Sequence, residues 1–143
     1  MKFENFMILE FPSKSANEAF ARSAVACFVA QLDPTLEELG DIRTAVSEAV
    51  TNCIVHAYPN ELGTIMLRCR ILKDNTIDIV IKDKGVGIQD LEQARKPMFT
   101  TGGADRSGMG FTIMESFMTN FSVTSKTNKG TCVHMRRKLQ RRK

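Results

Sequence analysis

The sequence predicts an α+β protein, a two-layer α/β sandwich with helices packed on one face of a mostly antiparallel mixed sheet. Three observations support this class. Segments with helical spacing are interleaved with β-branched segments. Short polar turns join most β-branched segments, which favours hairpins over the crossover helices of a parallel sheet. Finally, 143 residues with 43% hydrophobic composition suit one core, so we expect a single domain over residues 1–143.

The first predicted elements are a strand and a helix. Apolar alternation over residues 6–11 predicts a strand that Pro12 ends, because proline cannot donate to a ladder. Ser15 and Glu18 have the spacing of a capping box, in which the serine accepts from a free backbone N–H and the glutamate reaches back. A helix is therefore expected from this box to about Gln31.

A second helix is predicted over residues 36–57, with a break near Gly40 left open. Asp33 and Pro34 supply its expected start, as the N-cap and the first helical residue. One face of this helix is apolar at helical spacing and is expected in the core. Its members are Ile42, Ala45, Val46, Ala49, Val50 and Cys53.

The rest of the chain predicts two hairpins, two helices and a loop. The β-branched runs 64–72 and 76–82 should pair across a turn at 73–75, and runs 121–125 and 131–138 across 128–130. Between the hairpins we expect a short helix at 91–95, a loop at 99–107 and a helix over 108–119. The apolar residues of the last helix should be core: Phe111, Ile113, Met114, Phe117 and Met118.

The cysteines and the first residues predict the cellular setting. Cys27, Cys53, Cys69 and Cys132 are widely spaced without a C-x-x-C pair, so we expect buried free thiols rather than a metal or redox site. Charged residues interrupt residues 1–12, which argues against a signal peptide or a membrane span there. We therefore expect a cytoplasmic protein with no membrane partner.

The net charge of +4 is concentrated at the C-terminus. Six of the 20 basic residues fall within residues 136–143, which leaves 14 against 16 acidic residues elsewhere. This segment is expected to be a solvated or frayed tail, and no direct nucleic-acid partner is predicted. The alternative, nucleic-acid binding through the tail, predicts a steep dependence on salt.

Glu48 and Asn52 are the first candidate site residues. Four residues apart in a helix, they stack on one face beside the apolar stripe, given ~100° of rotation per residue. An amide oxygen can coordinate Mg²⁺, and a carboxylate beside it can handle the proton of a nucleophile. Two solvated helix residues are the alternative interpretation.

Two glycine-bearing motifs complete a predicted nucleotide site. In segment 83–87, Gly85 and Gly87 allow the backbone to approach a flat ligand, and Asp83 can accept from an adenine amino group. Segment 108–110 opens a helix whose free N–H groups and dipole favour phosphate. Each motif alone is common in turns and helix starts, but their joint occurrence in this order predicts nucleotide binding.

These motifs resemble a known family. Glu48-x-x-x-Asn52, Asp83-x-Gly-x-Gly87 and Gly108-x-Gly110 are similar to the N, G1 and G2 boxes shared by gyrase, heat-shock chaperone, histidine kinase and mismatch-repair ATPases. Residues 46–52, 97–101 and 106–115 resemble the bacterial anti-sigma factors that are serine-protein kinases, and most closely the sporulation members. The resemblance runs from about Leu9 to Leu139 and implies a histidine-kinase-type ATPase fold.

The resemblance implies ATP/ADP and Mg²⁺ as cofactors and a role for each matching residue. Glu48 would orient or deprotonate the attacking serine, and Arg106 would stabilise the γ-phosphate. Asn52 would bind Mg²⁺, and Asp83 would read adenine with help from Thr131. The expected nucleotide contacts are Asn52, Asp83, Gly85, Gly87, Thr100, Thr101, Gly108, Met109, Gly110 and Thr131.

The resemblance also implies the partners. An RNA polymerase sigma factor of the sporulation type would be bound and inhibited, an anti-anti-sigma protein would be phosphorylated on serine, and the kinase would be a homodimer. Arg22 matches a position used to contact the protein substrate, with a solvated surface arginine as the alternative.

Several alternatives stay open or are excluded by the sequence. Residues 102–105 depart from the family's usual stretch, so a nucleotide-dependent sigma-binding module without significant catalysis stays open, as does a stress-response anti-sigma kinase. A histidine kinase is excluded, because 143 residues leave no room for a phosphoacceptor domain. His56 and His134 are accordingly expected to be structural.

Overall fold

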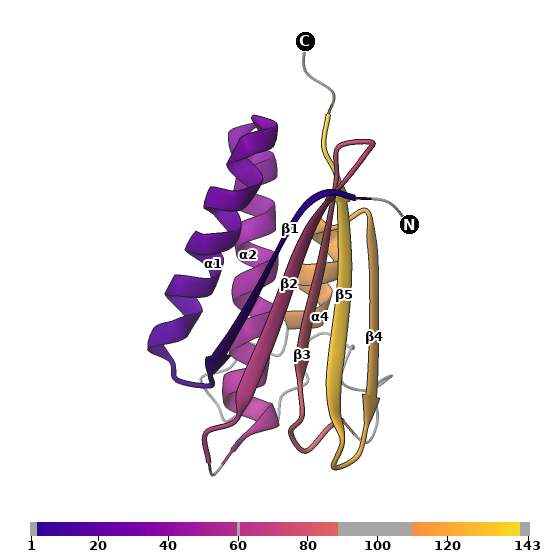
Figure 1. Cartoon of the computed structure of the whole chain (residues 1–143). Coiled ribbons are helices and arrows are strands. Elements are labelled where there is room, and N and C mark those ends of the chain that lie inside the picture. Colours follow the sequence, from indigo (N-terminus) through magenta and orange to yellow (C-terminus); the bar gives the residue numbers. More distant parts are fainter. Residues whose placement is uncertain (1–2, 60, 89–109, 141–143) are drawn as a thin grey trace.

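The structure is a computed structural model that describes residues 3–59, 61–88 and 110–140. One five-stranded sheet has the order β1-β2-β3-β5-β4, and the pairs among these described strands are antiparallel. Helices cover one face of the sheet, as Figure 1 shows, which confirms the two-layer prediction. The elements are β1 (Phe3–Pro12), α1 (Ala16–Val29), η1 (Ala30–Leu32), α2 (Leu36–Asn52), η2 (Cys53–Ala57), β2 (Thr64–Leu72), β3 (Thr76–Asp83), α4 (Gly110–Phe117), β4 (Asn120–Lys126) and β5 (Gly130–Lys138).

The core lies between the helices and the inner face of the sheet. All six residues of the predicted α2 stripe are buried, which confirms that helical spacing identified the packed face. Every second residue of β2 and β3 meets this stripe, beginning with Ile65 in β2 and Ile77 in β3. Phe111, Met114 and Met118 are buried as predicted, and Ile113 and Phe117 are partly buried. The sheet and α2 therefore hold each other in place through one continuous apolar layer.

The capping box predicted at the start of α1 is wrong. Ser15 is the N-cap, but its side chain makes no capping hydrogen bond, because its backbone is already helical, with φ −58° and ψ −33°. An N-cap residue normally has extended backbone geometry, which aims its side chain at the free N–H groups. Glu18 instead pairs with Arg22, at 3.2 Å between Oε2 and Nε.

A capping box does form at the start of α2, around Thr35 rather than the predicted Asp33 and Pro34. The Thr35 hydroxyl accepts from the Glu38 N–H at 3.0 Å, and Glu38 Oε1 accepts from the Thr35 N–H at 2.9 Å. Thr35 has the extended geometry that this exchange requires, with φ −69° and ψ 162°. Asp33 lies in the turn before it with φ 52°. The helix then passes through Gly40 without a break.

The predicted helix over residues 36–57 changes geometry near its end. Residues 36–52 form α2, and residues 53–57 continue as the π-helical turn η2. A π turn inserts extra backbone into a helix and is common beside functional sites. The hairpins are confirmed, with Asn75 at φ 63° in the first turn and Asn128 at φ 63° in the second. The predicted helix at 91–95 and the loop at 99–107 lie outside the described residues.

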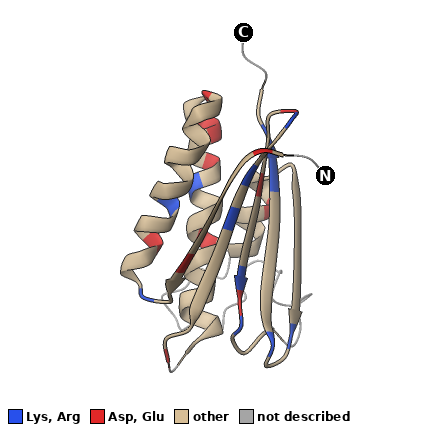
Figure 2. Ribbon diagram, in the orientation of Figure 1, with Lys and Arg blue, Asp and Glu red and all other residues tan. Residues whose placement is uncertain are grey.

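The outer face of the sheet carries a charged cluster centred on Asp78, whose side chain is fully buried. Asp78 accepts from Arg70 at 2.9 Å, from Arg136 at 2.8 Å and pairs with His134 at 2.5 Å. Burial raises the pKa of Asp78, but hydrogen bonds from His134, Arg136 and Arg70 outweigh it and hold that pKa below its ordinary value. Figure 2 shows basic residues on neighbouring strands. His134 is structural, as predicted.

Two other predictions need correction. The basic segment expected to be a tail over residues 136–143 begins inside the sheet, because β5 continues to Lys138 and two of its arginines bind buried or half-buried carboxylates. Of the four cysteines predicted to be buried, Cys53 and Cys69 are buried, Cys132 is half-buried and Cys27 is exposed. A cluster of like charges at a terminus therefore did not identify a solvated segment here.

The two capping patterns give a first testable prediction. Thr35→Ala removes an acceptor from the first turn of α2 and should lower the free energy of unfolding by about 1 kcal/mol. Ser15→Ala removes a hydroxyl that caps nothing, so its effect should stay within about 0.5 kcal/mol. Urea unfolding of both variants measures the difference. Equal losses would contradict the assignment of the box to Thr35.

Candidate functional site

Glu48, Asn52 and Gly110 come together where the end of α2 meets the start of α4. A Cβ placed on Gly110 would lie 3.2 Å from Asn52 Nδ2 and 3.4 Å from Glu48 Oε1. Both side chains are half-buried, because they lie beside the stripe that packs on the sheet. The absence of a side chain at Gly110 therefore brings the backbone of a helix start against a carboxylate and an amide.

Asp83 forms the second part of the site, at the end of β3. Its Oδ1 accepts the backbone N–H groups of Gly85 at 2.9 Å and Thr131 at 3.2 Å. Its Oδ2 lies 3.4 Å from Cys53 Sγ, which donates. Burial, and then the neighbouring Asp83 carboxylate, raise the pKa of the Cys53 thiol well above its ordinary value, so the thiol stays a donor. These contacts fix a carboxylate with about four acceptor positions, enough for one further donor.

The glycines of segment 83–87 allow close backbone contacts that a side chain would prevent. A Cβ on Gly85 would lie 2.1 Å from the Ala57 carbonyl oxygen, and the Val86 N–H donates to that same oxygen at 3.0 Å. Gly87 has φ 77°, a left-handed conformation that suits glycine, and a Cβ there would lie 2.2 Å from Lys126 O. The loop is thus held between η2 and the β4–β5 turn.

Three residues that the sequence analysis did not assign to the nucleotide site support this loop. Tyr58, the only tyrosine in the sequence, accepts the Lys84 N–H at 2.7 Å and donates to Thr64 O at 2.9 Å. Ser125 accepts the Ile88 N–H at 2.8 Å and shares a hydrogen bond of 2.7 Å with the Thr131 hydroxyl. Cys53 is the third. Of the three, only Cys53 could have been linked to the site from the sequence, because it directly follows Asn52.

The remaining predicted residues are placed differently. Thr100, Thr101, Arg106, Gly108 and Met109 lie outside the described residues, so their site roles remain predictions. Arg22 lies on α1, in an ion pair with Glu18. Among the described residues, no group of three or more His, Cys, Asp or Glu side chains is arranged to hold a metal ion. None of the described helices combines the length and apolar character of a membrane span.

The two parts of the site are joined through consecutive residues of one helix. Asn52 belongs to the Gly110 part, and Cys53 belongs to the Asp83 part. One part offers a fixed carboxylate at the end of a strand, suited to an amino group of a planar base. The other offers a carboxylate and an amide beside a helix start, suited to phosphate, a cation and proton transfer. The chemistry of both parts fits a nucleoside polyphosphate.

Comparison with known proteins agrees with this chemistry. Residues 11–137 match the model of the histidine kinase-like ATPase domain. The anti-sigma F factor of Caldanaerobacter subterraneus subsp. tengcongensis is 55% identical over 142 residues, covering 99% of both chains. This chain belongs to the anti-sigma F factor family. The family's member from Geobacillus kaustophilus is 51% identical over 97% of this chain and 96% of its own, and the member from Pasteuria penetrans is 55% identical over 95% and 92%.

Solved structures agree with the fold of this anti-sigma F family member. The RsbU and RsbW domains of a Mycobacterium tuberculosis protein align with a TM-score of 0.73 at 16% identity, over 97% of this chain and 34% of theirs. This chain therefore spans about a third of the length of that structure. A blue-light activated histidine kinase from Erythrobacter litoralis aligns with a TM-score of 0.59 at 20% identity, over 85% and 60%. At these identities the likeness supports the fold alone.

Two glycine substitutions test the Asp83 part of the site. Gly85→Ala brings a methyl group against the Ala57 carbonyl and must displace the loop that holds Asp83, so affinity for ADP should fall at least about tenfold. Gly40→Ala is the control, because Gly40 is exposed in α2 with nothing within 4 Å of an added Cβ. It should raise the free energy of unfolding by about 1 kcal/mol and leave ADP affinity unchanged.

Calorimetric titration with ADP measures the affinity of each variant, and urea unfolding measures its stability. Unchanged ADP affinity in a folded Gly85→Ala protein would contradict the placement of the adenine site beside Asp83.

Proposed function

We propose that this protein is an ATP-dependent serine-protein kinase and an anti-sigma factor. It would bind and inhibit a sporulation sigma factor of the sigma F type and phosphorylate the matching anti-anti-sigma factor on serine. The observation that carries the kinase assignment is the placement of Glu48 and Asn52 directly beside Gly110 at the start of α4. Membership in the anti-sigma F factor family supports the choice of partners.

The adenine end of ATP or ADP fits the Asp83 part of the site. The Asp83 carboxylate is held by two backbone N–H groups and a thiol, so it is already oriented when an adenine amino group arrives. Gly85 and Gly87 allow the loop backbone to pack closely against Ala57 and Lys126, which holds the loop beside Asp83. Thr131 lies beside Asp83 through its backbone N–H, which supports its proposed share in adenine binding.

The phosphates fit the Gly110 part. Free N–H groups at a helix start favour phosphate oxygens, and Gly108, Met109 and Gly110 are the proposed contacts. Mg²⁺, when bound with the nucleotide, would reduce the negative charge between the phosphates, with the Asn52 side-chain oxygen as its protein ligand. Thr100 and Thr101 are further proposed nucleotide contacts. Arg106 is proposed to stabilise the γ-phosphoryl group, since a guanidinium stays charged at every working pH.

Glu48 is the proposed general base. The substrate serine oxygen bonds to the γ-phosphorus as its proton passes to the Glu48 carboxylate, and the bond from that phosphorus to the bridging oxygen breaks. The products are phosphoserine, ADP and the proton that Glu48 has taken up and then releases to water, so atoms and charge balance. The half-buried position of Glu48 limits competing water around this carboxylate while leaving it open to the site.

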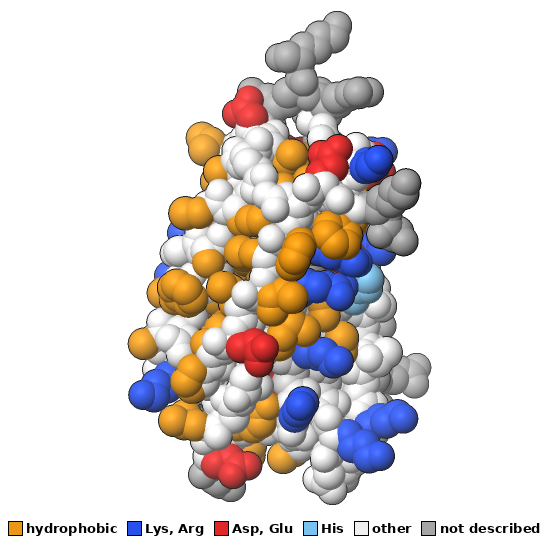
Figure 3. Space-filling model, in the orientation of Figure 1, with side chains coloured by type: hydrophobic (Ala, Val, Ile, Leu, Met, Phe, Trp, Pro, Cys, Tyr) orange, Lys and Arg blue, Asp and Glu red, His pale blue; other side chains and the backbone are white. Residues whose placement is uncertain are grey.

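The partners place further constraints on the proposal. The protein would act as a homodimer in the cytoplasm, where RNA polymerase sigma factors work. Arg22 is the proposed contact with the protein substrate. It lies on α1, in an ion pair with Glu18. Figure 3 shows apolar side chains gathered on the surface of the side of the molecule where α1 lies.

Phosphotransfer tests the kinase assignment. Glu48→Gln keeps the size of the side chain but removes the base, so the turnover number for phosphate transfer from ATP to the anti-anti-sigma protein should fall by about 10² or more. ADP affinity should stay within about twofold. Glu37→Gln is the matched control, because Glu37 is exposed in the first turn of the same helix.

Radiolabelled ATP and phosphoamino-acid analysis measure the reaction. If the wild-type protein captures a sigma factor with ATP but forms no phosphoserine, the kinase assignment is wrong. The protein is then a nucleotide-dependent binding module. Undiminished transfer by Glu48→Gln would remove Glu48 from catalysis.

The assembly gives a separate prediction. Size-exclusion chromatography with light scattering should give about twice the chain mass of 16.0 kDa for the protein alone. Added sigma F type factor should increase this mass when nucleotide is present. A single-chain mass at micromolar concentration would contradict the homodimer, and an unchanged mass with the sigma factor would contradict the anti-sigma role.

A further inference from the structure

Arg137 joins two helices that meet again at the nucleotide site. It lies in β5, one residue after Arg136, so its side chain points to the opposite face of the sheet, toward the helices. Its Nη1 donates to Asp41 Oδ2 at 2.8 Å and to the Phe117 carbonyl oxygen at 2.6 Å. Asp41 lies near the start of α2, and Phe117 is the last residue of α4. One guanidinium therefore ties the end of α4 to the beginning of α2.

The contact is partly shielded from water. The Arg137 and Asp41 side chains are 19% and 20% exposed, so the pair is less screened than a surface ion pair. The Phe117 carbonyl is among the last four of its helix, which have no N–H partner within the helix. A cation at this end also suits the helix dipole. Arg137 thus donates to the Phe117 carbonyl, places a positive charge at the negative end of the α4 dipole and neutralises the Asp41 carboxylate.

Apolar packing holds the body of α4, because Phe111, Met114 and the nearby Met118 are buried in the core. α4 contains eight residues, and a helix this short depends on tertiary contacts for its stability. Its C-terminal end is also joined to β5 by the Thr119 N–H, which donates to Arg136 O at 2.8 Å, and by Thr119 Oγ1, which accepts the Lys138 N–H at 3.0 Å. Arg137 adds a polar contact from this end of α4 to α2, beside the apolar packing that the two helices share.

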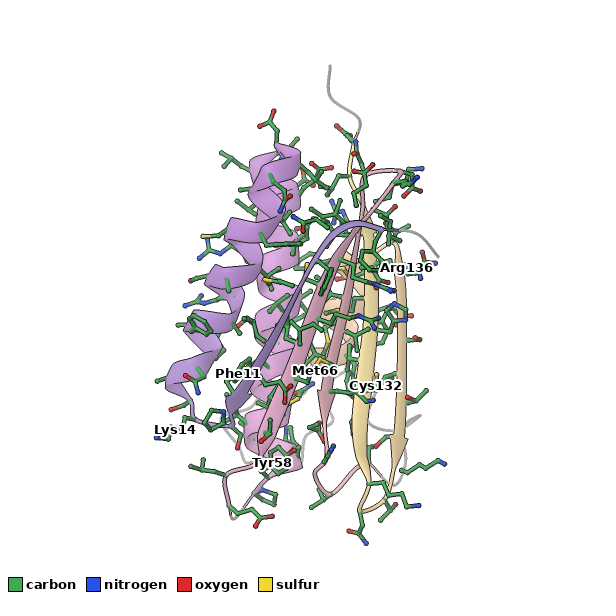
Figure 4. The ribbon with its side chains drawn as sticks, viewed as in Figure 1. Phe11, Lys14, Tyr58, Met66, Cys132 and Arg136 are labelled. Carbon is green, nitrogen blue, oxygen red and sulfur yellow. The ribbon has the colours of Figure 1, made fainter. Side chains whose placement is uncertain are left out.

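The opposite end of α4 has little tolerance for movement. A Cβ at Gly110 would lie 3.2 Å from Asn52 and 3.4 Å from Glu48, so the backbone there already approaches both side chains closely. α2 and α4 thus run antiparallel, with Asp41 opposite the end of α4 and Asn52 opposite its start. Figure 4 shows Arg136, the neighbour of Arg137, toward one end of the sheet and Tyr58, beside the Asp83 loop, toward the other.

We infer that Arg137 is a positioning residue for the phosphate end of the nucleotide site. By fixing α4 against α2 at Asp41, it sets the distance from the start of α4 to Glu48 and Asn52. This inference rests on the proposed function only in assigning the phosphates to the start of α4. Arg137 is not expected to affect adenine binding, which depends on Asp83 at the end of β3.

The test compares a ligand that has phosphates with one that lacks them. Arg137→Gln should lower affinity for ADP about tenfold and leave affinity for adenosine within about twofold. Lys138→Gln removes the same charge from the next residue, whose side chain is 61% exposed, and should change neither affinity. Arg137→Lys keeps a cation that can reach Asp41 and should recover part of the ADP affinity. Calorimetric titration gives all of these values.

Two results would overturn the inference: equal losses for ADP and adenosine, or no loss for ADP. If Arg137→Gln does not fold, Asp41→Asn weakens the same tie from the other side and should lower the ratio of ADP to adenosine affinity in the same direction. None of these measurements needs phosphate transfer or a protein partner. A failed kinase assay with the wild-type protein would therefore leave this result intact, and the reverse also holds.

Discussion

Burial of one stripe of α2 against the sheet is the constraint on which the site depends. The stripe from Ile42 to Cys53 is almost fully excluded from water, and burying an aliphatic side chain contributes about 1.5–3 kcal/mol. α2 cannot rotate about its axis without exposing several of these residues. Glu48 and Asn52 are consequently held at the edge of the core, where both are half-buried and face the start of α4. Their position therefore follows from the packing of the helix.

The change from α2 to the π turn η2 joins this edge to the end of β3. The wider turn brings Cys53 to Asp83 and aims the Ala57 carbonyl at the loop that follows, where it accepts the Val86 N–H. The same carbonyl leaves no room for a side chain at Gly85. One helix end thus positions both a carboxylate suited to a base and, one residue earlier, an amide suited to phosphate and a cation. At this helix end, the position of the group for the base is therefore coupled to the position of the group for the phosphates.

The fold was largely predictable from the sequence, because its signals are local. Helical spacing identified the α2 stripe, and short turns identified both hairpins within one or two residues. Capping was not predictable, since Ser15 with Glu18 and Thr35 with Glu38 carry the same pattern and only backbone geometry distinguishes them. The prediction that the basic C-terminal segment is a solvated tail was wrong for a related reason. Arg137 meets Asp41 across 96 residues, and no local pattern records such a contact.

The same distinction explains how much of the site could be predicted. Asp83 and Gly85 were identified and do lie together, because glycines beside a strand-end carboxylate are a local signal. Thr131, which also lies beside Asp83, was implied only by the family resemblance. Cys53 and Tyr58 were missed, since their contacts with residues 83 and 84 span 30 and 26 positions. The base end of the site is therefore fixed by a network of short, buried contacts. The phosphate end depends instead on how a short helix is held, so the fold can preserve binding of the base while the geometry around the phosphates is adjusted from the far end of α4.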